Sequence, residues 1–94
     1  MEIPGAERRV VYYRGRVQGV GFRYTVNRIA RRYRVTGYVR NLVDGRVELV
    51  AEGEADQVDQ FLNEVARTMS DFIGDCQKNH APASGEFADF GIQH

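Results

Sequence analysis

Two helical patterns separated by a hairpin signal constrain the fold of this 94-residue chain more than any other feature. In each pattern apolar residues recur every three or four positions, which is typical of a helix with one buried face. The first pattern comprises Phe22, Val26, Ile29, Ala30 and Tyr33. The second comprises Val58, Phe61, Leu62, Val65, Ala66 and Met69. Between them, the β-rich segments 35–41 and 46–51 flank Asp44-Gly45, a dipeptide that favours a tight turn between two strands.

A further strand is predicted over residues 9–14, where two valines and two tyrosines lie between arginines. Past Met69 the pattern weakens and allows an irregular strand over 72–80 and a short closing strand over 87–92. The order predicts an α+β fold, the ferredoxin-like split βαββαβ sandwich, with an antiparallel sheet and both helices on one face. A chain of this length has room for one core, so we expect a single domain over 1–94, with 1–7 as a loose N-terminal extension.

The charge of the chain is balanced overall but not along its length. Thirteen basic and thirteen acidic residues give a formal net charge of zero, which argues against a general binder of nucleic acid. Residues 1–40 nevertheless hold ten arginines and two acids, whereas residues 41–94 hold three basic residues and eleven acids. Because the two helices would be neighbours on the sheet, we expect much of this asymmetry to be compensated at the surface.

The sequence carries no strong signal for a metal, a disulfide or a membrane. Cys76 is the only cysteine, and with His80 it forms a C-x3-H pair whose one further companion histidine is His94. This falls short of the clusters that structural zinc sites need, so we expect no metal and no cofactor. A reducing, cytoplasmic setting is predicted, since no leader pattern and no apolar run of about 18 residues is present. The roles of these three residues stay open.

The junction between the first strand and the first helix carries the strongest chemical signal. Gly15, Gly19 and Gly21 fall within seven positions. Glycine tolerates positive φ, so backbone N–H groups of such a loop can converge on one point, and the following helix adds its unpaired amides and positive dipole end. The pattern predicts a site for a small anion. A tight turn beside a solvated arginine is the alternative.

Two side chains are candidates to complete this site. Arg23, at the start of the predicted helix, can offer a planar, permanently charged fork to a phosphate or carboxylate. The loop holds no Ser, Cys, His or Asp that could form a covalent intermediate, so any hydrolysis would use water directly. Asn41, at the end of the second predicted strand, has a donor and an acceptor with which to orient that water. An asparagine that merely starts a turn fits the same position.

The two segments that carry these residues resemble the signatures of a known family, the acylphosphatases. Residues 15–23 resemble the motif G-x-V-Q-G-V-x-F-R at every specified position. Residues 37–41, with Gly45, Val47 and Gly53 downstream, resemble the second signature of that family. The resemblance runs from about residue 10 to residue 65, whereas the end of the chain departs from the usual closing strand F-x-I-R-Y.

This resemblance implies a metal-independent hydrolase that cleaves the carboxyl–phosphate bond of acyl phosphates to a carboxylate and inorganic phosphate. By motif position, Arg23 would bind the phosphate and Asn41 would orient the attacking water. The phosphate-binding loop would comprise Gly15, Gln18, Gly19, Val20, Gly21, Phe22 and Arg23. The implied partners are the small-molecule acyl phosphate and inorganic phosphate. We expect a monomer with no nucleic-acid or membrane partner.

Three other interpretations stay open. The loop and Arg23 could hold a phosphorylated ligand without turning it over. The chain could correspond to the acylphosphatase-like domain at the start of hydrogenase-maturation carbamoyltransferases. An RNA-binding module shares this fold, but the segment 46–51 has no aromatic residue and carries Glu48, unlike the aromatic-rich strand of that module.

Overall fold

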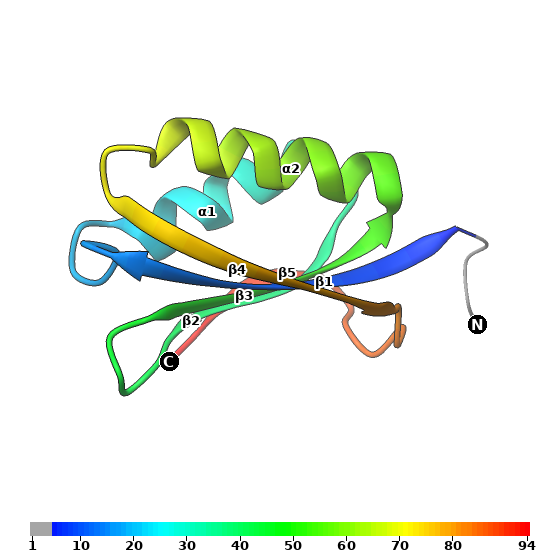
Figure 1. Ribbon diagram of the computed structural model, residues 1–94. Coiled ribbons are helices and arrows are strands. Elements are labelled where there is room, and N and C mark those ends of the chain that lie inside the picture. The colour runs from blue at the N-terminus through cyan, green and yellow to red at the C-terminus, as the bar shows by residue number, and fades with distance from the viewer. Residues whose placement is uncertain (1–4) are drawn as a thin grey trace.

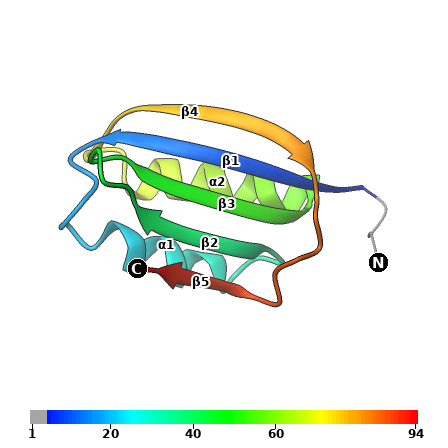
Figure 2. The same cartoon turned by 90° about the horizontal axis from the view of Figure 1, so that it is seen from below.

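Two helices cover one face of a five-stranded sheet in the computed structural model, which describes residues 5–94 (Figure 1). The elements follow one another as β1 (Ala6–Gly15), α1 (Phe22–Ala30), β2 (Thr36–Asn41), β3 (Val47–Glu54), α2 (Ala55–Thr68), β4 (Ile73–Pro82) and β5 (Phe90–Gln93). Within the sheet the strands lie in the order β4-β1-β3-β2-β5. Figure 2 shows the face that the helices leave open, with β4 and β5 at the two edges.

The core lies between the helices and the sheet. Side chains alternate along a strand, so Val47, Leu49 and Ala51 of β3 share one side of the sheet, and all three are fully buried. The helices contribute the apolar stripes that predicted them, with buried residues Phe22, Val26, Ile29 and Ala30 on α1 and Val58, Phe61, Leu62 and Val65 on α2. Each large apolar side chain buried in this way contributes roughly 1.5–3 kcal/mol, which attaches both helices to one face.

The predicted ferredoxin-like α+β sandwich is confirmed, with one correction to the sheet. The pairs β1–β3, β1–β4 and β2–β3 are antiparallel as expected, but β5 lies parallel to β2. The prediction of a wholly antiparallel sheet was therefore wrong at this edge. The reason is topological: β4 ends where β2 begins, so a chain that turns back from β4 runs in the same direction as β2.

Two strands differ in extent from the prediction. β1 begins at Ala6, and both Ala6 and Glu7 pair with the end of β3, so the loose extension was wrong for these two residues. Residues 1–4 lie outside the described part of the chain. β4 has ten residues and ends at Pro82, two residues later than predicted, and its pairing with β1 shifts register between Ile73 and Asp75, which confirms the expected irregularity; nine of its ten residues are exposed. Its backbone pairs with β1 at the sheet edge, where burial imposes no apolar pattern on the sequence.

Glu52 anchors the segment between β4 and β5 to the open face of the sheet. Its side chain is 4% exposed. It accepts hydrogen bonds from the amides of Ser84 (2.8 Å) and Gly85 (3.0 Å) and from the Arg8 guanidinium (2.7 Å). Burial alone would raise the pKa of Glu52, but these donors outweigh it and lower the pKa below that of an ordinary glutamate. The charged carboxylate therefore fixes the segment that connects β4, at one edge of the sheet, to β5 at the other edge.

We expect Glu52→Gln to make the free energy of unfolding depend less on pH in the acidic range. A carboxylate with a lowered folded pKa contributes stability that is complete above the unfolded pKa of about 4.3 and is lost as the pH falls through the folded pKa. The variant should be less stable than wild type at pH 7, and the difference should shrink below about pH 4. Urea unfolding across this range measures it, with the exposed Glu54→Gln as control. A difference that does not vary with pH would contradict the assignment.

Gly37 of β2 occupies a position at which the sheet requires glycine. Its φ is +135°, and an added Cβ would overlap the carbonyl oxygen of Val50. We expect Gly37→Ala to lower the free energy of unfolding by roughly 3 kcal/mol, because backbone strain and overpacking both contribute. Gly91→Ala on the adjacent β5 meets no atom within 4 Å and should cost less than about 1 kcal/mol. Equal losses of unfolding free energy in the two variants, measured by chemical denaturation, would refute this expectation.

Candidate active site

The sheet topology brings the two signature segments to one end of the molecule. β1 and β2 both pair antiparallel with β3, so they run in the same direction with β3 between them. The loop 16–21, which follows β1, and Asn41, the last residue of β2, therefore lie at the same end of the sheet. α1 begins at this end as well, because it follows the loop directly (Figure 1).

The loop between β1 and α1 depends on its glycines. Gly19 and Gly21 have φ values of +78° and +77°, in the left-handed region that other residues rarely adopt. At the start of the loop, a Cβ on Gly15 would lie 2.5 Å from backbone atoms of Phe72 and Gly74. These glycines therefore allow the chain to leave β1, pass close to the start of β4 and enter α1.

Gln18 ties the loop to the β2–β3 turn. Its side-chain nitrogen Nε2 donates hydrogen bonds to the carbonyl oxygens of Leu42 (2.8 Å) and Arg46 (3.0 Å). Those two residues close the hairpin immediately after Asn41, since the Leu42 amide donates to the Arg46 carbonyl at 2.8 Å. Gln18 thus holds the loop against the end of the strand that carries Asn41.

The N-terminus of α1 faces a small hollow. Gly21 takes the N-cap position without a side-chain cap, and the first turn holds no acidic residue. Its amides and the positive end of the helix dipole can therefore act on an anion. The hollow has a volume of about 210 Å³ and is lined by Val17, Gly19, Gly21, Phe22, Arg23 and Tyr24.

Arg23 brings a full positive charge to this hollow. Within residues 5–94 its guanidinium forms no ion pair with a carboxylate. Its Nη1 lies 3.4 Å from Nδ1 of His94. His94 reaches this position because β5 runs parallel to β2 and so ends at the same end of the sheet. The charge of Arg23 is therefore available to an anionic ligand.

Asn41 carries a buried polar atom without a partner. Its Oδ1 accepts no hydrogen bond from any residue in the range 5–94. Leaving such an atom unpaired costs about 1–3 kcal/mol, and buried carbonyl oxygens in folded proteins are generally paired. Asn41 comes two residues after the fully buried Val39 and opposite Val47, which places it on the helix side of the sheet. That is the side of α1 and Arg23.

The other predicted loop residues differ in their exposure. Phe22 is 1% exposed and its ring centroid lies 5.2 Å from that of Tyr13, so only its backbone can contact a ligand. Val20 is 40% exposed at the surface of the loop. Next to the loop, the guanidinium carbon of Arg16 lies 5.7 Å from the centre of the Phe72 ring.

Two residues near the site were not predicted from the sequence. Tyr24 is 66% exposed and lines the hollow. Its position directly after Arg23 is the signal that could have included it. His94 approaches Arg23 through the pairing of β5 with β2, and the sequence left that strand uncertain.

Cys76 and His80 do not form a metal site. Both lie on the exposed edge strand β4, four residues apart, a spacing that separates their Cα atoms by about 13 Å. In the described part of the chain no group of three or more His, Cys, Asp or Glu side chains is arranged to hold an ion. Neither helix of that part is long and apolar enough to cross a membrane.

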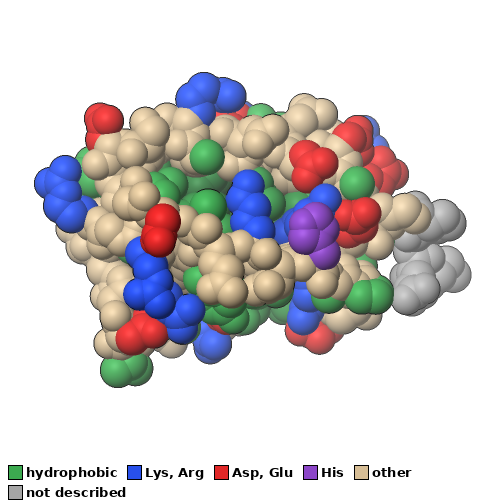
Figure 3. Space-filling view, viewed as in Figure 1, with side chains coloured by type: hydrophobic (Ala, Val, Ile, Leu, Met, Phe, Trp, Pro, Cys, Tyr) green, Lys and Arg blue, Asp and Glu red, His purple; other side chains and the backbone are tan. Residues whose placement is uncertain are grey.

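Four of the ten arginines of the first half pair with acids of the second half. Arg8 pairs with Glu52 (2.7 Å), Arg9 with Asp59 (3.1 Å) and Arg40 with Glu48 (2.7 Å). Figure 3 shows the side chains of Lys and Arg interspersed with those of Asp and Glu over one face of the molecule. The asymmetry along the sequence is therefore compensated in part, and Arg23 is one of six arginines of the first half that form no ion pair within the described chain.

Known proteins are similar to this chain in sequence and in fold. The profile of the acylphosphatase family matches residues 9–92. The chain belongs to the acylphosphatase family. An acylphosphatase from Methanospirillum hungatei is 54% identical over 54 residues, which are 57% of this chain and 59% of that relative. The sequence match thus spans less than two thirds of the relative's length.

Solved structures are similar to this acylphosphatase-family chain over nearly its whole length. The acylphosphatase from Bacillus subtilis gives a TM-score of 0.80 at 31% identity, covering 95% of this chain and 99% of that one. HypF from T. kodakarensis gives a TM-score of 0.80 at 30% identity, covering 94% of this chain and 12% of that one. The fold of this family is therefore found both as almost an entire chain and as a small part of a longer one.

Proposed function

We propose that this acylphosphatase-family chain hydrolyses acyl phosphates to a carboxylate and inorganic phosphate. In the proposed reaction a water oxygen bonds to phosphorus, the bond between phosphorus and the carboxyl oxygen breaks, and the carboxylate leaves with the electron pair. The protons of the water remain with the phosphate or pass to solvent. A carboxylate is a good leaving group, so the reaction needs positioning and charge stabilisation rather than a strong acid.

Arg23 and the loop are the proposed phosphate site. The guanidinium can form a bidentate contact with two phosphate oxygens, while the amides from Gln18 to Arg23 and the start of α1 offer further donors. Each hydrogen bond to a charged group contributes about 1.5–3 kcal/mol. Support comes from the absence of a carboxylate partner for Arg23 within residues 5–94 and from the hollow that it lines.

Asn41 is the proposed orienting residue for the water. The observation that carries the proposal is its buried Oδ1, which accepts no hydrogen bond within the described chain. A water bound there would donate a hydrogen bond to this atom and keep a lone pair for phosphorus. Asn41 does not titrate, so it would act by position and not by removing the proton in a general-base step.

Substrate selectivity tests this function. We expect rapid release of phosphate from benzoyl phosphate and none above background from phenyl phosphate. The phosphate site is the same for both, but a phenolate is a poorer leaving group, and the loop residues 15–23 include no acidic side chain to protonate it. Failure to cleave benzoyl phosphate, with inorganic phosphate still bound, would identify a binding module instead.

Chelators are expected to leave the activity unchanged. The proposed chemistry assigns charge stabilisation to Arg23 and backbone amides, and no cluster of metal-ligating side chains occurs within residues 5–94. Turnover of benzoyl phosphate should be equal before and after dialysis against EDTA. A loss that a divalent cation restores would show that the phosphate is held in another way.

Two alternatives rest on specific observations. A non-catalytic phosphate-binding module would use the same hollow and Arg23, but it would release no phosphate from benzoyl phosphate. The match to 12% of HypF favours a second possibility, a role as one part of a larger protein. An RNA-binding module is disfavoured, because the side chains of β3 on the open face include Glu48 and Glu52 and no aromatic residue.

The proposed setting follows from the same features. We expect a monomer that acts on small acyl phosphates and has neither nucleic-acid nor membrane partners. The interspersed surface charges favour this, since polyanion binders present a basic patch. A cytoplasmic location is part of the proposal, because the exposed free thiol of Cys76 suits a reducing compartment.

A further inference from the structure

The exposed apolar side chains of the described chain gather at the end of the molecule that carries the proposed phosphate site. Among residues 5–94 the large apolar side chains that are exposed are Val20 (40%), Tyr24 (66%) and Val43, which is fully exposed. Val20 lies in the loop before α1, Tyr24 in the first turn of α1, and Val43 in the β2–β3 turn. Single exposed apolar residues are common, but here all three lie at one end of the sheet. Of the three, only Tyr24 lines the hollow at the start of α1.

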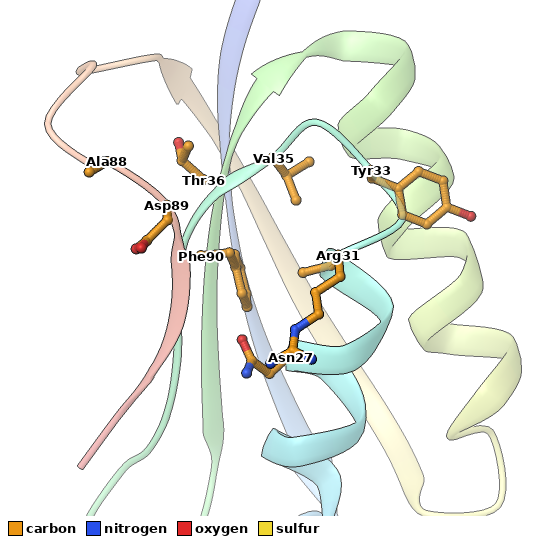
Figure 4. A pocket seen from close by; sticks show the side chains of 9 residues that line it. Asn27, Arg31, Tyr33, Val35, Thr36, Ala88, Asp89 and Phe90 are labelled. Carbon is orange, nitrogen blue, oxygen red and sulfur yellow. The ribbon is translucent and has the colours of Figure 1, made fainter.

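Tyr24 occupies the side of α1 that faces away from the sheet. Successive helix residues are about 100° apart, so Tyr24 lies about 200° around the helix from Phe22, which is buried on the sheet side. A second hollow, of about 320 Å³, lies between α1 and β5, and Figure 4 shows Asn27 and Arg31 lining it from α1. Arg23 precedes Asn27 by about one helical turn and so shares the side toward β5. The helix thus presents Phe22 to the sheet, Arg23 toward β5 and Tyr24 to the outside.

A side chain in the first turn of a helix leans over the segment that precedes the helix. Every Cα–Cβ bond of a helix is tilted toward the N-terminus, so Tyr24 covers surface over the loop that leads into α1. This agrees with its place in the lining of the hollow, together with Gly19 and Gly21. Neither glycine has a side chain that could separate the tyrosine from a ligand. An aromatic residue therefore borders the proposed phosphate site on the side away from the sheet.

The direction of the proposed hydrolysis, on which this step rests, places the acyl group on the same side. In phosphoryl transfer the attacking and leaving oxygens lie roughly in line, on opposite sides of phosphorus. Asn41 lies at the end of β2, so a water bound to its unpaired Oδ1 would approach the phosphate from the sheet. The leaving carboxylate would therefore point away from the sheet, toward Tyr24.

We propose that Tyr24 contacts the acyl group and selects acyl phosphates with an aromatic or similarly large apolar acyl group. Its ring offers a flat apolar surface, against which an aromatic acyl group can stack or pack edge-on. Covering apolar surface is favourable in proportion to the area removed from water, so an acetyl group gains much less. For a phenyl group at this open site we expect roughly a tenfold gain in affinity. Tyr24 thus determines specificity, while Arg23 and the loop hold the phosphate that all these substrates share.

Binding of two phosphate monoesters tests this assignment without turnover. Phenyl phosphate and methyl phosphate carry the same phosphate group and differ only in the group on the bridging oxygen. In nuclear magnetic resonance titrations we expect wild type to bind phenyl phosphate about tenfold more tightly than methyl phosphate, and Tyr24→Ala to bind the two within about twofold. Tyr24→Phe should keep the wild-type preference. Equal affinity of the two esters in wild type, or a preference that Tyr24→Ala retains, overturns the proposal.

Kinetics of matched variants separate this inference from the proposed hydrolysis. For Tyr24→Ala we expect the KM for benzoyl phosphate to rise about tenfold, with kcat and the KM for acetyl phosphate within about twofold of wild type. Val43→Ala, at an exposed apolar position of the β2–β3 turn, should change neither KM. Equal changes of KM for the two substrates, as a structural defect would give, refute the role of Tyr24. If neither substrate is cleaved while phenyl phosphate is still preferred, the proposed hydrolysis fails and the apolar subsite stands.

Discussion

Replacement of Arg23 by alanine is expected to lower kcat/KM for benzoyl phosphate by about 10³-fold or more. The substitution removes a full charge and a bidentate donor from the place where the phosphate would bind. Loss of one preorganised donor to a developing charge typically costs 10²- to 10³-fold, and the loss of ground-state phosphate binding adds to this. Steady-state kinetics together with the inhibition constant of inorganic phosphate measure both contributions.

The matched control for Arg23 is Arg28 on the same helix. Arg28 is exposed and does not line the hollow, so Arg28→Ala should stay within about twofold of wild type. Arg23→Lys should recover part of the lost activity, because it restores the charge but not the planar fork. Wild-type kinetics in a folded Arg23→Ala protein would exclude Arg23 from the site.

Replacement of Asn41 by alanine is expected to reduce kcat roughly 10²- to 10³-fold while phosphate still binds. If Asn41 orients the water, its loss removes an interaction made with the nucleophile and leaves Arg23 and the loop intact. The inhibition constant of inorganic phosphate should therefore change much less than kcat. Kinetics and phosphate inhibition measured on the same preparation provide the comparison.

The fold of the Asn41 variant needs its own check. Truncation also removes the unpaired Oδ1 from the interior, so the variant should not lose stability from that atom. Asn63→Ala, on the exposed surface of α2, is the matched control and should leave kcat unchanged. If phosphate binding collapses together with kcat in a folded Asn41→Ala protein, Asn41 belongs to the phosphate site and not to the water.

Local periodicity predicted the helices of this fold better than its edges. Phe22, Val26 and Ile29 are buried on one face of α1, so their spacing is visible in the sequence. β4 lies at an edge with almost every side chain exposed, and its pairing with β1 is made by backbone groups that leave no apolar pattern. The direction of β5 depends on where the chain leaves β4, which is a property of the whole topology.

The candidate site also has parts that the local sequence predicts and parts that it does not. Arg23 and the glycines could be predicted because a turn with positive φ followed by a helix is encoded within a few consecutive residues. The bonds of Gln18 to Leu42 and Arg46 join segments more than twenty residues apart, and spacing alone does not reveal them. The approach of His94 to Arg23 and the hollow between α1 and β5 likewise require the arrangement of distant elements.

The most direct test of the proposed mechanism is hydrolysis of benzoyl phosphate in water enriched in ¹⁸O. After subtraction of the spontaneous reaction, mass spectrometry of the products reports which atom the water attacks. Direct attack on phosphorus predicts one ¹⁸O atom in inorganic phosphate and none in benzoate. Label in benzoate, or no hydrolysis above the spontaneous rate, would contradict the central claim that this site delivers water to a bound phosphate.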